Sequence, residues 1–285
     1  MSILQRLMPI AVLALAVLGA GPWPLAGAEA SAAGDWAEGP HTKARLIAAR
    51  WDGGAAAEIA IEIRLERGWK TYWRNPGDAG VPPRLDWSGS QNLKSTSAAW
   101  PVPVKLPDPY GQSIGYKGNV VVPVRLGAEE AGKPIKIRLD LEYGVCAEVC
   151  IPVNAKLSLD LAPGGQDGRF EALIADWKAR TPAREAGASG LSVSAVQRLT
   201  GGKTGLMVTI TGKGGLTAPD LLVEGPEAFY FSIPELVSKQ ADRASFKIMI
   251  DGADDAGALM GHSITLTLID GKRAQEITWP LGKGM

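Results

Sequence analysis

The chain has 285 residues, of which 46% are hydrophobic and 21% are charged, a composition typical of globular proteins and not of disordered ones. Its 30 Lys and Arg residues balance its 30 Asp and Glu residues, so the formal net charge is zero. Without an excess of basic residues, neither nucleic acid nor an anionic membrane surface is expected as a partner.

Residues 1–30 have the pattern of a secretory signal peptide. One positive charge, at Arg6, precedes an apolar run over residues 7–18, and small residues at 26–28 or 28–30 fit a signal-peptidase site. The apolar run is shorter than the ~20 residues of a membrane-spanning helix, and an uncleaved anchor is the alternative. We therefore expect export to a bacterial periplasm, where a pair of cysteines meets oxidising chemistry.

From residue 31 onward, apolar and polar side chains alternate with a period of two. The alternation is clearest over residues 59–65, 135–142 and 157–161. Such alternation is typical of antiparallel strands that bury one face. Clusters containing Gly, Pro, Asn or Asp mark turns between the strands, at residues 75–78, 81–83, 107–109 and 127–128.

The strand pattern ends at residues 162–165, and a short helix is predicted next. Four apolar residues recur at positions i, i+3, i+4 and i+7, which form one face of a helix. These residues are Phe170, Leu173, Ile174 and Trp177. A stretch rich in Ala, Gly and Ser follows over residues 181–190, and strand patterns resume at Leu191.

The sequence therefore predicts an all-β protein of two β-sandwich domains joined by a short, helix-bearing linker. The first domain is expected over residues 31–163 and the second over residues 191–285. The linker between them is expected over residues 164–190.

Histidine-based chemistry is not expected, because the chain holds only His41 and His262. A paired-histidine zinc site would have too few ligands. A Ser-His-Asp hydrolase would also need a Gly-x-Ser-x-Gly elbow, which the sequence lacks. The chemistry therefore depends on the two cysteines, Cys146 and Cys150, and no bound cofactor is required.

The spacing of the cysteines restricts how they can pair. On one straight strand, Cys146 and Cys150 would share a face about 13 Å apart. A disulfide needs Cα atoms at roughly 4.4–6.8 Å, so the chain must fold back between the two residues if they pair. The loop closed is tiny, and its chain-entropy stabilisation is only about 2 kcal/mol. A bridge in such a turn would be well placed for attack by another thiolate.

Three interpretations of the pair remain open from the residues themselves. It is an inert local disulfide, a two-thiolate Cu(I) site or a pair that undergoes redox exchange. The chain has only six methionines, none of them near the cysteines, which disfavours copper. Glu148 would raise the pKa of a neighbouring thiol, and Lys156 or Arg74 is a candidate for stabilising a thiolate against it.

Three stretches of the first domain resemble the periplasmic N-terminal domain of the thiol:disulfide interchange protein DsbD, in particular its suppressor-of-copper-sensitivity (ScsB-type) branch. The first stretch, residues 68–78, reads GWKTYWRNPGD. The second combines DPYG at 108–111, GYKG at 115–118 and VVPV at 121–124. The third, residues 143–152, reads YGVCAEVCIP and contains both cysteines. The region after about residue 190 resembles, less distinctly, a second β-sandwich of the ScsB-type periplasmic portion.

This resemblance implies an immunoglobulin-like fold in which Cys146 and Cys150 shuttle between dithiol and disulfide. It implies that a membrane partner with a thioredoxin-like module reduces the pair, which then reduces oxidised periplasmic proteins such as disulfide isomerases. By family mechanism, Cys150 is expected to form the mixed disulfide.

The resemblance also implies residues that surround the pair. Asp108 and Tyr110 match the cap loop that shields the cysteines, and Trp69 and Tyr72 match aromatic residues that line the site. The aromatic residue that usually covers the cysteines is matched by Pro109, which leaves Tyr110 or Tyr116 as the substitute cap.

The chain ends at Met285 without the membrane-spanning carrier or the thioredoxin-like domain of that family. We therefore expect a separate protein to supply electrons to this thiol-disulfide oxidoreductase. Two rival functions remain: a non-enzymatic immunoglobulin-like binding module whose cysteines brace a turn, and a periplasmic copper-tolerance protein.

Overall fold

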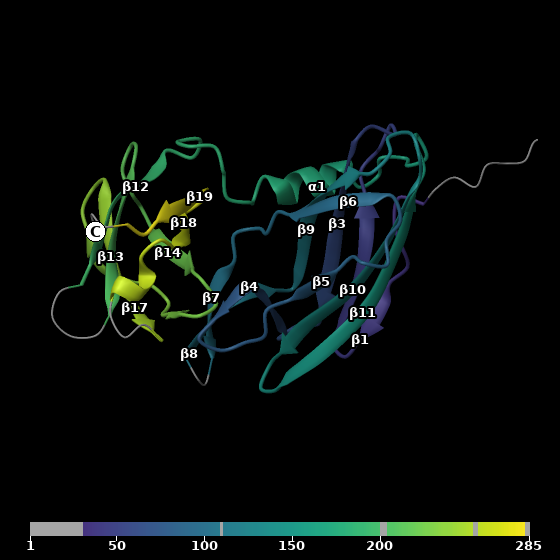
Figure 1. The fold of residues 1–285 in the computed structure, drawn as a ribbon. Helices are drawn as coiled ribbons and strands as arrows, with labels where there is room; N and C mark the ends of the chain where they lie inside the picture. The colour runs from purple at the N-terminus through teal and green to yellow at the C-terminus, as the bar shows by residue number, and fades with distance from the viewer. Residues whose placement is uncertain (1–30, 109–110, 200–203, 253–255, 283–285) are drawn as a thin grey trace, which may run out of the picture.

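The computed structural model describes residues 31–108, 111–199, 204–252 and 256–282. The predicted signal peptide and Tyr110 lie outside these ranges. The regular structure is almost entirely antiparallel strand, which confirms the predicted all-β fold class. An N-terminal half (residues 31–162) and a C-terminal half (residues 180–282) lie side by side (Figure 1).

The N-terminal half consists of two packed sheets. Its strands are β1 (Ala37–Gly39), β2 (Thr42–Ala48), β3 (Ala56–Leu65), β4 (Lys70–Gly77), β5 (Arg84–Asp86), β6 (Leu93–Ala98), β7 (Val104–Asp108), β8 (Gly111–Lys117), β9 (Asn119–Ala128), β10 (Ile135–Cys146) and β11 (Cys150–Leu161). One sheet has the order β1-β2-β3-β9-β6, and the other has the order β11-β10-β4-β8-β7, with β5 paired to β10. The apolar residues predicted to alternate in β3, β10 and β11 fill the core between the sheets.

The C-terminal half also consists of two sheets around a core of its own. Its strands are β12 (Leu191–Arg198), β13 (Gly205–Gly212), β14 (Pro219–Glu224), β15 (Tyr230–Phe231), β16 (Glu235–Lys239), β17 (Arg243–Asp251), β18 (Ser263–Asp270) and β19 (Arg273–Pro280), with a 3-10 helix at Ala256–Leu259. One sheet has the order β12-β13-β17-β15, with β16 paired to β17, and the other has the order β14-β18-β19. The domain boundaries proposed from the sequence stay predictions.

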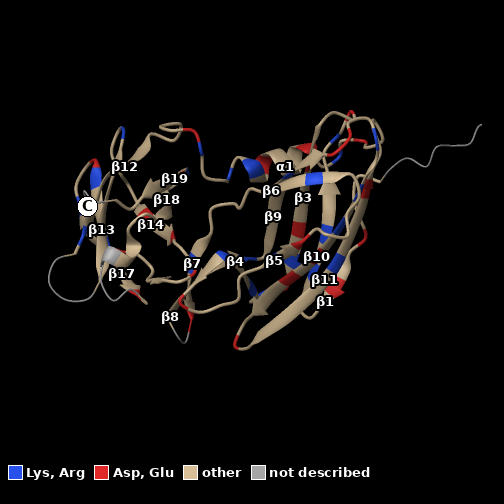
Figure 2. Ribbon diagram, in the orientation of Figure 1, with Lys and Arg blue, Asp and Glu red and all other residues tan. Residues whose placement is uncertain are grey.

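The helix predicted between the halves forms as α1 (Glu171–Lys178). Ile174 is buried on its inner face and packs with Ile47, Ala60 and Val121, which lie on the outer face of the first sheet. Among the described residues, no helix has the length and hydrophobicity to cross a membrane. Acidic and basic residues are intermingled on both halves, in keeping with the zero net charge (Figure 2).

Two predicted turns are wrong. Residues 127–128 are the last two residues of β9 and pair with β6, so the strand ends after the predicted turn. Residues 75–78 were expected to form a turn, but β4 continues to Gly77. Tyr72 pairs with Gly115 and Gly77 pairs with Ser113, so residues 73–76 of β4 face a single residue of β8. The extra residues are accommodated as a bulge, and this bulge carries Arg74 and Asn75 to the C-terminal half.

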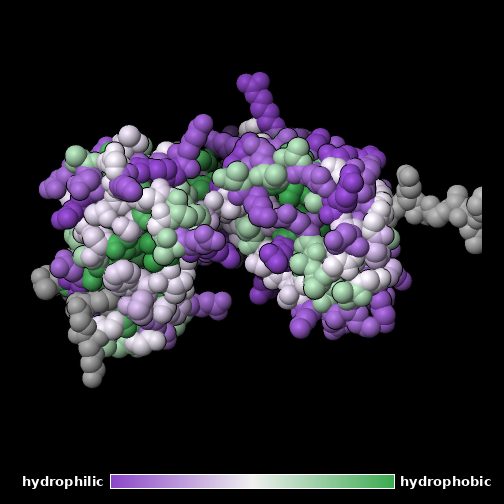
Figure 3. All heavy atoms as spheres, turned by 90° about the horizontal axis from the view of Figure 1, so that it is seen from above, coloured by the Kyte–Doolittle hydropathy of each residue, from purple (hydrophilic) through white to green (hydrophobic). Residues whose placement is uncertain are grey.

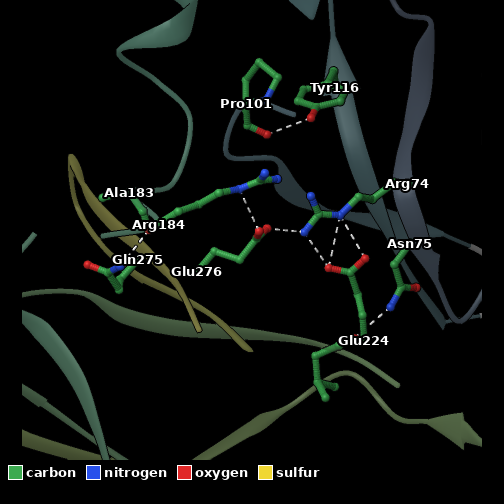
Figure 4. Close-up of polar contacts among 10 residues, drawn as sticks. Arg74, Asn75, Pro101, Tyr116, Ala183, Arg184, Glu224, Gln275 and Glu276 are labelled. Carbon is green, nitrogen blue, oxygen red and sulfur yellow. Dashed lines mark hydrogen bonds and ion pairs between the residues drawn. The ribbon is translucent and has the colours of Figure 1, made fainter. Parts of the chain in front are cut away.

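Arg74 joins the two halves (Figure 4). Its guanidinium donates to both carboxylate oxygens of Glu224, at 2.8 and 2.6 Å, and also to Glu276. Glu276 pairs in turn with Arg184 at 3.0 Å. Because the Arg74–Glu224 contact is bidentate and mostly buried, it defines the geometry of the joint more strictly than a single surface ion pair would.

A cleft of about 690 Å³ lies where the N-terminal half, α1 and the segment that follows α1 meet. The space-filling view shows two lobes joined at a waist (Figure 3), and residues of both halves line the cleft. Its charged lining residues include the ion pairs Lys178–Glu58 at 2.5 Å and Arg184–Glu276 at 3.0 Å. Opposite charges therefore largely cancel along its walls.

Candidate functional site

The two cysteines form a disulfide at the tip of the β10–β11 hairpin. The strands pair without a break from Ile135 and Leu161 to Cys146 and Cys150, whose Cα atoms are 4.2 Å apart. The three residues between them form the turn, in which the Ala147 N–H donates to the Val149 carbonyl at 3.1 Å. The chain thus folds back in the way that pairing of these cysteines requires, and Figure 1 draws this tip at the lower edge of the N-terminal half.

The two cysteines differ in their access to solvent. Cys146 is 0% exposed, whereas Cys150 and the three turn residues before it are exposed. Val149, next to Cys150, presents 65% of its surface to solvent. An incoming thiolate can therefore reach the exposed end of the disulfide, while the other sulfur is held inside the protein.

Tyr72 holds its hydroxyl on the disulfide. The hydroxyl donates to Cys146 Sγ at 2.8 Å and lies 3.1 Å from Cys150 Sγ. Tyr72 and Lys70 are two residues apart on β4 and point to the same face, and Lys70 is the cross-strand partner of Cys146. The strand register thus brings the phenol to the sulfurs.

Two glycines make room for the Tyr72 ring. A Cβ atom at Gly144 would lie 3.0 Å from the ring, and one at Gly80 would lie 2.5 Å from it. Gly80 has a φ of 141°, which side chains rarely adopt. The ring therefore lies between two backbone segments that have no side chain to separate them from it.

A buried ion pair lies beside the cysteine strand. Lys70 Nζ is 2.8 Å from the Asp108 carboxylate and 3.0 Å from Ser113 Oγ, and it also donates to the Pro107 carbonyl at 3.4 Å. The side chains of Lys70 and Asp108 are only 8% and 9% exposed. A buried charge is costly unless it is paired, so separating Lys70 from its partners would be unfavourable. The contacts therefore hold β4 against the β7–β8 hairpin next to Cys146.

The environment keeps Tyr72 protonated. Burial raises the pKa of its hydroxyl above 10.0, and the negative charge of Asp108 raises it further. At neutral pH the phenol is therefore a hydrogen-bond donor to the sulfurs and carries no charge of its own.

The other residues predicted at the site lie in different places. Tyr116 pairs with Thr71 in the core and donates its hydroxyl to the Pro101 carbonyl at 2.7 Å (Figure 4). This is the face of β8 opposite to the disulfide, so the geometry brings Tyr116 into the sandwich and not over the cysteines. Trp69 packs on the core and stacks on His41, with ring centroids 4.0 Å apart.

Neither cation considered from the sequence reaches the cysteines. Arg74 pairs with Glu224 and Glu276, and Lys156 lies 3.7 Å from Asp140.

Sequence reasoning missed Lys70, whose partner Asp108 is 38 residues away. Its only signal in the sequence is its place two residues before Tyr72, which puts both side chains on one face of a strand. In the part of the chain that the structure describes, no group of three or more His, Cys, Asp or Glu is arranged to hold a metal ion.

Two family models match the chain. Residues 41–162 match the family described as thiol:disulfide interchange protein DsbD, N-terminal. Residues 180–284 match a domain of unknown function, DUF8393. The first match contains the whole disulfide site, and the second contains most of the C-terminal half. No curated protein matches the sequence.

Among solved structures, the chain is similar to the N-terminal periplasmic domain of ScsB from Proteus mirabilis. That structure is 26% identical, and the similarity covers 89% of this chain and 99% of that one with a TM-score of 0.72. The N-terminal domain of DsbD from Neisseria meningitidis, in the reduced form, is 21% identical over 42% of this chain and 84% of its own. Its TM-score of 0.26 is too low to establish a common arrangement.

Proposed function

We propose that this chain, which belongs through residues 41–162 to the DsbD N-terminal domain family and to its ScsB-type branch, passes electrons by thiol–disulfide exchange through Cys146 and Cys150. One observation carries the proposal. The disulfide joins an exposed cysteine at a hairpin tip to a buried one, and the Tyr72 hydroxyl lies within hydrogen-bond distance of both sulfurs. The membership supports thiol–disulfide exchange as the kind of chemistry, and the route of the electrons is our proposal.

The first step is attack on the exposed sulfur. A thiolate of the reducing partner attacks Cys150 Sγ, a bond forms between these two sulfurs, and the Cys146–Cys150 bond breaks. The electron pair of the broken bond goes to Cys146 Sγ, which leaves as a thiolate. A second thiolate of the partner then displaces Cys150 and completes the transfer of two electrons. The partner ends as a disulfide, and this chain ends as a dithiol after taking up two protons.

Tyr72 supports the departure of Cys146. Negative charge develops on Cys146 Sγ as the bond breaks, and the hydroxyl that already donates to this atom at 2.8 Å stabilises that charge. A leaving thiol of lower pKa departs faster in exchange reactions. The buried position of Cys146 favours Cys150 as the residue of the mixed disulfide.

The reverse reaction delivers the electrons. The Cys150 thiolate attacks a disulfide of an oxidised protein, and Cys146 then displaces that protein as a thiol and restores the disulfide. We propose a membrane-embedded or thioredoxin-like reductase as the donor and disulfide-bonded periplasmic proteins as acceptors. The location would be the periplasm, with residues 1–30 as the signal for export; the relative in Proteus mirabilis is a periplasmic domain.

The reduction potential of the pair tests the proposal. The mature protein is equilibrated against glutathione buffers, and the free thiols are counted after quenching. A potential between about −180 and −270 mV would place the pair among exchange proteins. A potential below about −300 mV would be that of a structural disulfide, and the chain would then be better explained as a binding module braced by its cysteines.

A further inference from the structure

The C-terminal half contacts the N-terminal half along the end of the strand that carries Tyr72. Asn75 donates to the Val223 carbonyl at 2.8 Å, immediately after the Arg74 joint (Figure 4). A Cβ atom at Gly77 would lie 3.0 Å from Ile233. The next residue, Asp78, accepts a hydrogen bond from the Tyr230 hydroxyl of β15.

Asp78 connects this contact to the disulfide site. Its backbone N–H donates to the Gln112 carbonyl at 3.0 Å, and its Oδ2 accepts from the Gln112 N–H at 3.1 Å. The other carboxylate oxygen, Oδ1, accepts the hydrogen bond from the Tyr230 hydroxyl. Asp78 is thus held from two sides, by β8 of its own half and by β15 of the other.

The segment that starts at Asp78 then packs on Tyr72. Two residues on, Gly80 lies directly against the Tyr72 ring, and Val81 lies next to Gly144 on the other side of that ring. Residues 78–81 belong to no strand, and the side-chain bonds of Asp78 fix the start of this segment. A path leads from the Tyr230–Asp78 hydrogen bond, along the chain to Gly80, and through the Tyr72 ring to the sulfurs.

We infer that the C-terminal half, whose family has no assigned function, positions the redox site of the N-terminal half, and that Tyr230 is its positioning residue, acting on Tyr72 through residues 78–81. The inference rests on the proposed function only for its biological use. The effect of the path on the rate at which the disulfide reacts with a thiol can be measured with any thiol, whatever the biological partner is.

Removing the Tyr230 hydroxyl isolates this path. Tyr230 is 45% exposed, and the halves stay joined by Arg74 and by the pair of Lys105 with Asp220 at 2.5 Å, so Tyr230→Phe is expected to fold and to remain assembled. The matched control is Tyr143→Phe, which removes a phenol hydroxyl that bonds Thr42 at 3.0 Å inside the core.

The experiment measures the rate at which dithiothreitol reduces the full mature chain. A dithiothreitol thiolate attacks Cys150 Sγ, Cys146 leaves as a thiolate, and the second dithiothreitol sulfur releases Cys150 and closes the oxidised ring. We expect Tyr230→Phe to slow this reaction about threefold, near the low end of the coupling seen between residues of one contact network, and Tyr143→Phe to leave it unchanged. In a Tyr72→Phe background, Tyr230→Phe is expected to have no further effect.

Two results would overturn the inference. One is an unchanged rate in Tyr230→Phe. The other is the same slowing with and without the Tyr72 hydroxyl, which would mean that Tyr230 acts by another route, such as general stability. Because dithiothreitol replaces the protein partner, either result leaves the proposed function standing. A reduction potential in the range of structural disulfides would instead contradict the proposed function, and the path from Tyr230 to Tyr72 could still be tested.

Discussion

The two halves of the chain are built by the same rules and differ in how they use a buried ion pair. In the C-terminal half, Asp270 and Arg273 close the β18–β19 hairpin three residues apart, and Asp270 also accepts the backbone N–H groups of Thr217 and Ala218. In the N-terminal half, Lys70 and Asp108 are 38 residues apart and lie beside the disulfide.

The comparison teaches which buried charges belong to the fold and which belong to a site. Asp270 satisfies backbone groups of its own sandwich, so its contacts explain its presence completely. Lys70 and Asp108 instead join β4 to the β7–β8 hairpin, beside the strand that carries Cys146. Similar chemistry thus closes a hairpin in one half and lies beside the disulfide in the other.

The largest effect expected is loss of exchange in Cys150→Ala with the fold retained. The loop that the disulfide closes is tiny, so its removal costs only about 2 kcal/mol. Transfer of electrons from a reduced thioredoxin-like protein should fall to the background rate, while the far-ultraviolet circular dichroism spectrum and cooperative unfolding persist. Loss of cooperative unfolding in this variant would mean that the disulfide braces the N-terminal half.

Breaking the two buried ion pairs separates their roles. Lys70→Met removes the buried Lys70–Asp108 ion pair and should lower the free energy of unfolding by about 3 kcal/mol, as Asp270→Asn should in the other half. Only Lys70→Met is expected to change the rate of reduction by dithiothreitol. Urea unfolding and the reduction rate are measured on both variants. If both variants are reduced by dithiothreitol at the same rate, Lys70 serves only the stability of the fold, as Asp270 does.

Tyr72→Phe tests the phenol alone. The ring and its packing between Gly80 and Gly144 remain, so the free energy of unfolding should change by only about 1 kcal/mol. Without the donor to Cys146 Sγ, reduction by dithiothreitol should slow about tenfold, the effect of losing a hydrogen bond to a developing charge. Faster reduction would show that Tyr72 shields the disulfide and does not activate it.

The smallest effect concerns pH. Burial alone would raise the pKa of Asp270, but Arg273 and the N–H groups of Ala218 and Thr217 outweigh it, so the pKa is lowered below 3.8. A carboxyl whose pKa is lower in the folded state stabilises the protein above its unfolded pKa, and this contribution is lost as the pH falls through the folded value. Thermal unfolding from pH 5 to about pH 2 should show a flatter decline for Asp270→Asn than for the parent chain. Parallel declines would contradict the assignment.

Much of the fold was predictable from local pattern. The alternation of apolar residues over 59–65, 135–142 and 157–161 predicts strands β3, β10 and β11, because one face of each must be buried. The helical spacing after residue 165 predicts α1 with Ile174 inward. The turn expected at residues 75–78 was wrong because Pro and Gly also occur in bulges, and which of the two forms depends on the partner strand.

Sequence alone determined the residue types of the site: two cysteines four residues apart, with Tyr72 in a stretch that resembles a known redox family. Only the tertiary structure decided which neighbours they have. The ring of Tyr72 lies between Gly80 and Gly144, Lys70 finds Asp108, and Tyr116 turns into the core. The physical reason is range: periodicity records which face of a strand is buried, whereas the pairing of distant strands, and with it every contact to the sulfurs, is chosen by the packing of the whole sandwich.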